Sequence, residues 1–239
     1  KQDLLVVVRL TESYIFRRAV CGIAANSMRR TFATFIQGIK KDQYLVSIQS
    51  KFARLLESRR FPTDSEFKRE IKVRDLYQIR SGAYWLCRLE NYGRKEQAWV
   101  DDYTIEHILP QNPKLSAEWK ESLGPEWQRI QKTWLHTLGN LTLTGYNQSY
   151  KDSAFPIKRD LEKGGNDIGF RYSPLKLNKG LGQVEVWSEQ AIQDRAEVLA
   201  NLALKVWTMP TIDDDFWADA PNELKYTKSS TLAAQPQLV

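Results

Sequence analysis

The sequence has few of the residues on which several common protein classes depend. Its 239 residues include only two cysteines, Cys21 and Cys87, which lie far apart in the chain. Such a pair excludes a zinc site with four cysteine ligands and favours two reduced thiols in a cytoplasmic protein. Apolar runs are short: the run at residues 4–8 is far below the length of a membrane span. We therefore expect a cytoplasmic protein with no membrane segment and no signal peptide.

Two further absences narrow the function. The chain contains no repeat of fixed period and no glycine-rich loop of the Walker type, so a nucleotide-hydrolysing site of that kind is not expected. Charge of one sign is in modest excess, with 35 Lys and Arg against 29 Asp and Glu. Residues 211–239 are acidic, so the basic surplus lies in the residues before them. A basic body suits a polyanion such as DNA, although charge alone leaves the partner open.

Hydrophobic periodicity predicts that residues 1–98 are helical. Gly22 is a stop signal for the first helix, and Asn26 or Ser27 is a candidate cap for the second. Thr63 begins the pattern Thr-Asp-Ser-Glu, which is typical of a capping box at a helix N-terminus. Five helices are expected. The first ends near residue 21, the second covers residues 26–40 and the third covers about 44–56. The fourth begins after Thr63, and the fifth covers residues 74–91.

The pattern changes near Trp99. Two short β-prone runs and several helices are expected in the second half, with a loop rich in glycine at residues 164–183. Beyond Pro210 the chain becomes acidic and then polar, which predicts a mobile tail. The expected strands lie at residues 103–105 and 141–144, and the expected helices lie near 126–134, from 146, at 156–163 and at 187–207 with Ser188 as cap.

Two motifs in the second half carry chemistry. The stretch Ile-Glu-His-Ile-Leu-Pro-Gln at residues 105–111 contains one of the two histidines of the chain. The run Leu-Gly-Asn-Leu-Thr-Leu follows at residues 138–143, and Asn147 comes shortly after it. A histidine base and oxygen ligands for one hard metal ion are the catalytic groups of a one-metal phosphodiesterase.

Each residue of the motifs has a candidate role. His107 suits a general base, while Glu106 and Asn147 offer a carboxylate and an amide oxygen to Mg²⁺ or Mn²⁺. Asn140 is placed to hold the imidazole through the backbone near His107. Neighbours on a strand face opposite sides, so Glu106 and His107 can reach one site only if the strand bends at its end. His136 is interpreted as a packing or helix-end residue.

The order of a strand with His, a loop, a strand with Asn and a helix with Asn is that of the HNH, or ββα-metal, nucleases. Residues 102–112 and 138–147, followed by Phe155 and Lys158, resemble the C-terminal nuclease domain of the GmrSD family. This family comprises modification-dependent restriction endonucleases and includes SspE-type phage-defence nucleases. Residues 12–18 and 59–64 are similar to the helical connector of such proteins.

The resemblance implies a mainly α fold, in which a helical bundle accompanies a small ββα-metal (HNH) core with a two-stranded antiparallel hairpin. It implies a connector at residues 1–98, a nuclease domain with a closing helix at 99–210 and a tail at 211–239. His107 would be the base, Asn140 the orienting residue, and Glu106 and Asn147 the ligands of one Mg²⁺ or Mn²⁺. Asn112 and Gln148 are alternatives to Asn147. Full-length relatives also carry an N-terminal nucleotide-hydrolysing sensor domain.

Several interpretations remain open from the sequence. Lys151, Lys158 and Arg159 follow the second motif and are candidate contacts to DNA phosphates, although a solvated helix face fits them equally well. The leading hypothesis is a DNA endonuclease that nicks or cuts both strands in a restriction or antiphage defence system. The first alternative is a DNA-binding module with a silent or sensor-regulated HNH fold. The second is a helical interaction protein without a role on nucleic acid.

Overall fold

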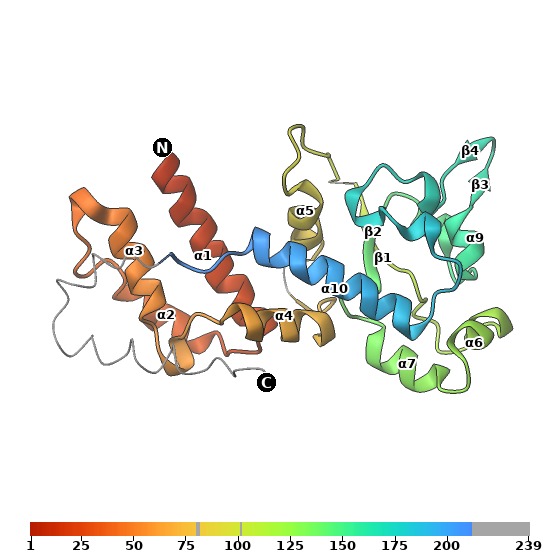
Figure 1. Ribbon diagram of the computed structural model, residues 1–239, viewed down its shortest axis with the longest axis horizontal. Helices are drawn as coiled ribbons and strands as arrows, with labels where there is room; N and C mark the ends of the chain where they lie inside the picture. The colour runs from red at the N-terminus through yellow and green to blue at the C-terminus, as the bar shows by residue number, and fades with distance from the viewer. Residues whose placement is uncertain (80–81, 101, 212–239) are drawn as a thin grey trace, which may run out of the picture. The chain divides into compact units, whose positions relative to one another are not determined.

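A computed structural model describes residues 1–79, 82–100 and 102–211 of the chain (Figure 1). It divides into two compact units. One comprises Lys1–Tyr14, Ala24–Phe61 and the described residues from Met209 onward, and the other comprises Ile15–Ile23 and Pro62–Thr208. From residue 212 onward, the expected tail lies outside the residues that the structure describes. The prediction of a mainly helical chain with a small two-stranded antiparallel sheet is confirmed.

The first unit is built from three helices. These are α1 (Gln2–Val20), of which the part up to Tyr14 belongs here, α2 (Asn26–Ala33) and α3 (Tyr44–Ala53). Its core is aromatic: the rings of Tyr14 and Phe52 lie 5.0 Å apart, and Phe61 packs against both. Leu10 completes the buried cluster.

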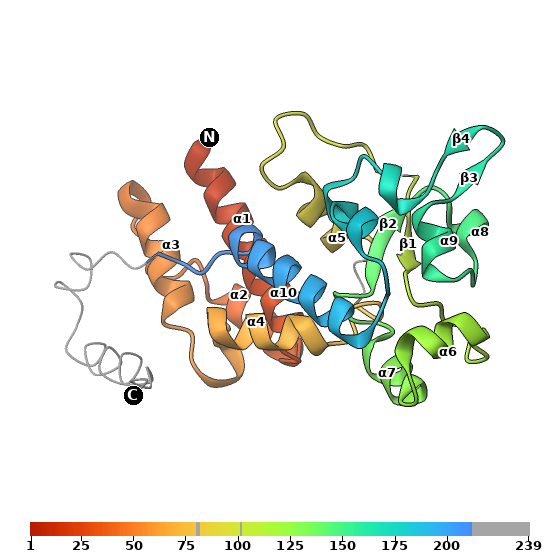
Figure 2. The same cartoon turned by 45° about the vertical axis from the view of Figure 1, so that its right-hand side comes forward.

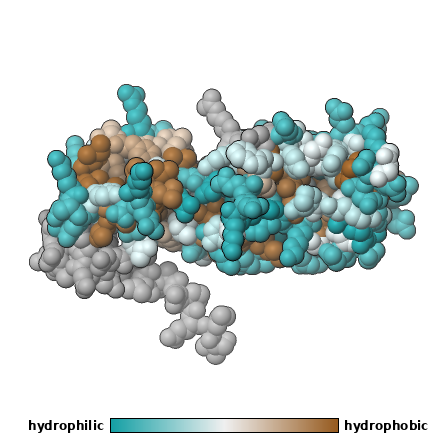
Figure 3. Space-filling model, turned by 90° about the horizontal axis from the view of Figure 1, so that it is seen from above, coloured by the Kyte–Doolittle hydropathy of each residue, from teal (hydrophilic) through white to brown (hydrophobic). Residues whose placement is uncertain are grey.

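The apolar residues in the first turns of α1 do not form this core. Leu4, Leu5 and Val8 are 61%, 48% and 55% exposed, whereas Leu10 and Tyr14 on the same helix are buried. Figure 3 shows brown, hydrophobic side chains gathered over the N-terminal helices on one face of the molecule. The periodicity thus predicted the helix correctly, while the residues that α1 buries lie further along it, at Leu10, Tyr14 and Phe16.

Helix α2 is shorter than the sequence predicts, because it ends at Ala33 instead of near residue 40. The ammonium of Lys51 on α3 donates hydrogen bonds to the carbonyl oxygens of Thr34, Phe35 and Gln37. A side chain from another helix therefore takes the carbonyls that a continued α2 would have paired internally. Neither Asn26 nor Ser27 caps the helix, since Ala25 holds the N-cap position.

In the second unit, α4 (Asp64–Val73) begins as predicted, with the Thr63 hydroxyl accepting a hydrogen bond from the Glu66 amide. Helix α5 (Tyr84–Asn91) begins ten residues later than predicted, since the chain is extended at Arg74. Just beyond Arg74, the Leu76 amide donates to the carbonyl of His136 at 2.9 Å. The segment that the sequence assigned to a helix is thus fixed to a distant part of the chain.

Helix α10 (Glu189–Val206) confirms the predicted helix at residues 187–207. Its N-cap is Ser188, whose hydroxyl accepts a hydrogen bond from the Ala191 amide. In Figure 1 it runs alongside α4, and α5 also packs against it. The residues of α10 that are buried are apolar, namely Ile192, Ala196, Leu199, Ala200, Ala203 and Val206.

The sheet of the second unit joins β1 (Thr104–His107) to β2 (Leu141–Thr144) in antiparallel register, with His107 opposite Leu141 (Figure 2). Every residue of β2 is buried. The strands are not joined by a tight turn, since α6 (Ala117–Leu123) and α7 (Trp127–Trp134) lie between them in the chain. Two short helices follow β2, α8 (Asn147–Tyr150) and α9 (Phe155–Arg159).

A second small sheet spans the end of the helix predicted at residues 156–163 and the start of the expected glycine-rich loop, because α9 ends at Arg159. Strands β3 (Glu162–Lys163) and β4 (Asn166–Asp167) pair across Gly164 and Gly165, whose φ angles are +60° and +78°. Short 3-10 helices complete the fold at Lys41–Gln43, Glu57–Arg59, Phe170–Tyr172, Lys176–Asn178 and Leu181–Gln183. Over the residues that the structure describes, no helix has both the length and the apolar character needed to cross a membrane.

Candidate active site

A cavity of about 1160 Å³ lies beside β1 and the start of α8, within the second unit. Glu106, His107 and Asn147 all line it, although they come from two different elements. Both neighbours at the end of β1 thus border one cavity. The wall also includes Tyr77, Gln111, Gln148, Lys151 and Asp152.

His107 is the last residue of β1 and is only 4% exposed. Its Nε2 lies 3.0 Å from Nδ1 of His136, and the ring of Tyr77 makes a T-shaped contact with the imidazole, with 4.7 Å between centroids. Burial, followed by electrostatic repulsion from His136 and Lys158, lowers the pKa of His107 to about 3. The imidazole is therefore neutral at neutral pH and keeps a lone pair for accepting a proton.

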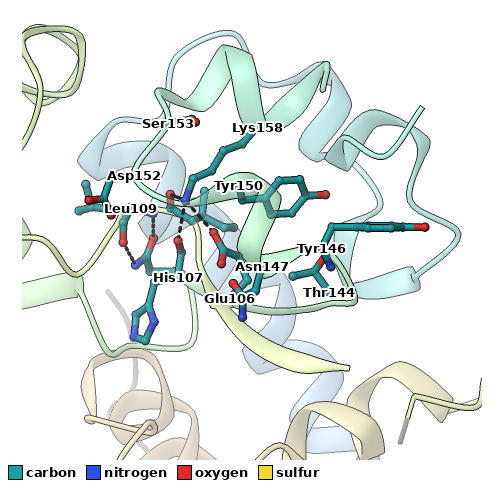
Figure 4. Close-up of polar contacts among 12 residues, drawn as sticks. Glu106, His107, Leu109, Thr144, Tyr146, Asn147, Tyr150, Asp152, Ser153 and Lys158 are labelled. Carbon is teal, nitrogen blue, oxygen red and sulfur yellow. Dashed lines mark hydrogen bonds and ion pairs between the residues drawn. The ribbon is translucent and has the colours of Figure 1, made fainter. Parts of the chain in front are cut away.

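Glu106 forms a buried ion pair with Lys158 of α9. The Lys158 ammonium lies 2.7 Å from Oε1 of Glu106 and donates to the carbonyl oxygens of His107 and Ile108 at 3.1 Å (Figure 4). Burial raises the pKa of Glu106 and lowers that of Lys158, and the attraction between them opposes both changes. Lys158 was a candidate phosphate contact, but its side chain is fully buried, so its ammonium is not on the surface.

The other two candidate DNA contacts differ from each other. Arg159 is mostly buried, and its guanidinium is held by the carboxylates of Asp160 at 2.6 Å and Glu185 at 2.9 Å. Lys151 is exposed and lines the cavity, and its ammonium has no hydrogen-bond or ion-pair partner among the residues described. Of the three, Lys151 is the cation that a phosphate at this cavity would meet.

Asn140 is fully buried just before β2, and its amide uses its whole hydrogen-bonding capacity. Oδ1 accepts from the Leu109 amide at 2.7 Å and from Nε1 of Trp187 at 3.2 Å. Nδ2 donates to the carbonyl oxygens of Leu109 and Leu135 at 3.0 and 2.9 Å. Asn140 thus holds the backbone two residues after His107, which fixes the strand end that carries the imidazole.

The turn that presents Asn140 is itself held by α10. A Cβ atom on Gly139 would lie 2.1 Å from the carbonyl oxygen of Ile192, so the close approach of the helix requires glycine there. Arg195, one turn further along α10, donates to the carbonyl oxygens of Gly139 and Leu141 at 2.7 and 2.9 Å. Burial lowers the pKa of Arg195 to about 9. The Leu-Gly-Asn-Leu motif is therefore explained by packing as well as by the site.

Asn147 opens α8 with its amide group oriented by β1. Its Nδ2 donates to Oγ1 of Thr104 at 2.7 Å and to the carbonyl oxygen of Ile105 at 3.0 Å. Because that carbonyl can only accept, the nitrogen must face it and Oδ1 must point the other way. In the described part of the chain, Oδ1 has no hydrogen-bond partner, which leaves it available to a ligand.

These atoms fit a hard metal ion with few protein ligands. Glu106 has Oε2 without a hydrogen-bond partner in the described chain, and Asn147 offers Oδ1 at the same cavity. Mg²⁺ takes oxygen ligands and keeps several waters, so two protein oxygens suffice. The described residues contain no group of three or more His, Cys, Asp or Glu with metal-site geometry, which disfavours a closed structural site. Of the alternatives, Gln148 lines the cavity, whereas Asn112 donates to Asp152 at 2.8 Å.

Two residues of the cavity wall, Tyr77 and Asp152, and one neighbour of His107, namely His136, were missed or discounted from the sequence. His136 contacts His107 directly, and Tyr77 stacks on His136 with 5.3 Å between ring centroids. Asp152 lines the cavity and raises the pKa of Glu106 further, after burial. The rarity of histidine was a usable signal for His136. Tyr77 and Asp152 carried none, because their positions depend on tertiary structure.

Comparison with known proteins agrees with both motifs. Residues 61–202 match the family model for the C-terminal domain of the GmrSD restriction endonucleases. A search of curated proteins and a search of solved structures each found no match. The family match covers more than half of the chain and contains every residue of the cavity named above. The chain therefore belongs to the GmrSD restriction endonucleases, and its second unit corresponds largely to their C-terminal domain.

Proposed function

We propose that this chain is a metal-dependent DNA endonuclease of a bacterial restriction or antiphage defence system. In this proposal β1, β2 and α8 form a ββα-metal (HNH) core. The observation that carries it is that Glu106, His107 and Asn147 line one cavity in a member of the GmrSD restriction endonucleases. A base and two oxygen ligands at one cavity are the groups that phosphodiester hydrolysis requires.

His107 acts as the general base. The imidazole is neutral at neutral pH, so it has a lone pair with which to take a proton from a water molecule in the cavity. The hydroxide so formed attacks the phosphorus atom while the bond to the leaving oxygen breaks. Asn140 keeps the end of β1 in place through its hydrogen bonds to the Leu109 backbone, which supports a constant position of the imidazole.

Glu106 and Asn147 would hold one Mg²⁺ or Mn²⁺ through Oε2 and Oδ1. When bound, the ion supplies positive charge at the scissile phosphate, where negative charge develops in the transition state. Lys158 keeps Glu106 in position through Oε1 and ties the same segment through two backbone carbonyls. The carboxylate is thus oriented before the ion arrives.

DNA is the proposed substrate, and Lys151 at the cavity is its nearest exposed cation. Lysine contacts to phosphate add affinity without sequence preference. Recognition of modified DNA would then belong to an N-terminal nucleotide-hydrolysing sensor domain of the full-length protein, acting in the cytoplasm.

The test is cleavage of supercoiled plasmid in Mg²⁺, in Mn²⁺ and in EDTA. Conversion to open-circle or linear DNA is expected with metal alone, and His107→Ala should slow it by about 10²- to 10⁴-fold. Glu106→Gln should also lose cleavage, whereas Glu96→Gln, at an exposed glutamate without a partner in the described chain, should not. Unchanged cleavage by His107→Ala would overturn the proposal.

A second candidate is a DNA-binding module whose nuclease site is silent or waits for a sensor. The Glu106–Lys158 ion pair favours it, because the ammonium already occupies one oxygen of the only carboxylate on β1. Binding of duplex DNA that survives EDTA, with no cleavage in either metal, would support this candidate over the first.

A further inference from the structure

The two histidines of the chain contact each other beside the cavity that His107 lines, although 28 residues separate them in the sequence. Nε2 of His107 and Nδ1 of His136 lie 3.0 Å apart, with the rings nearly perpendicular at 79°. That distance requires a proton between the two nitrogens. No hydrogen bond joins Nδ1 of His107 to any residue that the structure describes.

We propose that His136 is a positioning residue, which accepts a hydrogen bond from Nε2–H of His107 and thereby assigns Nδ1 as the nitrogen that takes the water proton. A neutral imidazole has one donor nitrogen and one acceptor nitrogen. If Nε2 donates to His136, the lone pair must be on Nδ1, the nitrogen without a partner. This inference rests on the proposed function for its catalytic meaning, but the hydrogen bond itself can be tested without cleavage.

His136 is built to hold one orientation. Its ring stacks on Tyr77 with an interplanar angle of 11°, and its carbonyl oxygen accepts from the Leu76 amide at 2.9 Å. On its other side, the carbonyl of neighbouring Leu135 accepts from Nδ2 of Asn140 at 2.9 Å. The backbone and the ring of His136 are thus both fixed, from segments on two sides. A partner held this firmly can impose its orientation on His107.

The proton inventory during the reaction is simple. Water gives one proton to Nδ1 of His107 and its oxygen forms the new bond to phosphorus. The proton on Nε2 stays between the two rings, so the imidazolium that forms remains hydrogen-bonded to His136. The leaving oxygen takes a proton from solvent water as its bond to phosphorus breaks, and the extra proton on Nδ1 of His107 returns to solvent afterwards, so no additional reactant is needed.

Two substitutions separate this role from packing. His136→Phe keeps a ring for stacking on Tyr77 but removes the acceptor. His136→Asn removes the ring and places an amide oxygen near the former Nδ1. Measured on plasmid DNA, kcat should fall roughly 10- to 100-fold in His136→Phe and less in His136→Asn, with KM unchanged in both. Near-parental kcat in His136→Phe together with a loss in His136→Asn would show that the ring only packs, and would overturn the proposal.

A second measurement needs no activity. In a ¹⁵N-labelled chain with no histidine tag, long-range ¹H–¹⁵N spectra at neutral pH contain two imidazoles, because the chain has two histidines. His107 should show a protonated Nε2 and His136 an unprotonated Nδ1, and the His107 Nε2–H signal should shift in His136→Phe. Protonated Nδ1 on His136 would overturn the proposal. If the spectra agree but no DNA is cleaved, the proposed function fails and the hydrogen bond stands.

Discussion

Glu106 and His107 are neighbours on β1, yet the fold surrounds them in opposite ways. The carboxylate of Glu106 is paired with a buried cation, while the imidazole of His107 contacts His136 and Tyr77 and no carboxylate in the described chain. A carboxylate hydrogen-bonded to the imidazole would raise the pKa of His107. The absence of such a carboxylate from the described chain therefore helps to keep His107 neutral. The comparison shows that two buried titratable groups one residue apart can have opposite electrostatic surroundings, set by their separate partners.

The largest expected effect is on the free energy of unfolding, and it comes from removing the cation that pairs with Glu106. Lys158→Met would leave the Glu106 carboxylate buried without its cation and two carbonyl oxygens without a donor. Loss of one partner of a buried pair typically costs about 3–5 kcal/mol in the free energy of unfolding. Urea unfolding followed by tryptophan fluorescence would measure it.

The matched control is the double variant Glu106→Gln with Lys158→Met. Removing both charges should recover part of the lost stability, because no uncompensated charge remains in the interior. A single variant that unfolds within about 1 kcal/mol of the parent chain would mean that water reaches the pair and that the site is not dry.

The surroundings of His107 should determine how the stability of the chain changes as the pH falls. The pKa of His107 is about 3 in the folded chain against 6.5 in the unfolded chain, so between these values only the unfolded chain binds the proton. Stability is therefore lost as the pH falls below 6.5. Between pH 7 and pH 5 the loss from this residue is about 2 kcal/mol.

The comparison chain for this experiment is His107→Phe. The pKa of Glu106 is raised by burial, which stabilises the folded chain on acidification, but this opposite contribution is present in both chains and cancels in the difference. The free energies of unfolding of the parent chain and of His107→Phe, measured in urea at pH 7, 6 and 5, should converge as the pH falls. Parallel losses in the two chains would show that His107 is protonated in the folded state.

Metal addition should act on the Glu106 side alone. Mn²⁺ at about ten times its Kd should add about 1.4 kcal/mol to the free energy of unfolding, which raises the Tm by a few degrees. Glu106→Gln and Asn147→Ala should lose this increase, while His107→Phe should keep it. Calorimetric scans with Mn²⁺ and with EDTA would measure it. An increase that also disappears in His107→Phe would place the imidazole among the ligands.

Much of the second unit could be read from the sequence because its signals are local. Thr63 and Ser188 cap α4 and α10 through their own side chains, and β2 occupies the predicted residues 141–144. Features decided by distant contacts could not be read in this way. The extended chain after Arg74 depends on a hydrogen bond to His136, and the end of α2 depends on Lys51.

The candidate site shows the same division. His107, Glu106, Asn140 and Asn147 were found because spacing within short motifs identifies them, and three of the four line the cavity while Asn140 holds its wall. Their partners escaped notice, since hydrogen bonds across long sequence separations leave no periodic pattern. The burial of Lys158 is the clearest case: in sequence a lysine on a short helix suggests a solvated face, and only the carboxylate opposite it makes the interior favourable.

The smallest expected effect concerns the cations around the cavity. Lys151→Ala should lower the slope of log Kd against log salt concentration for duplex DNA by about 0.9, because one phosphate contact is lost. Arg159→Ala should leave the slope unchanged, since Asp160 and Glu185 already neutralise that guanidinium. Fluorescence anisotropy in EDTA would measure both without cleavage. An equal fall in the two variants would mean that DNA binding breaks the Arg159 ion pairs, and a fall in Arg159→Ala alone would move the DNA path away from Lys151.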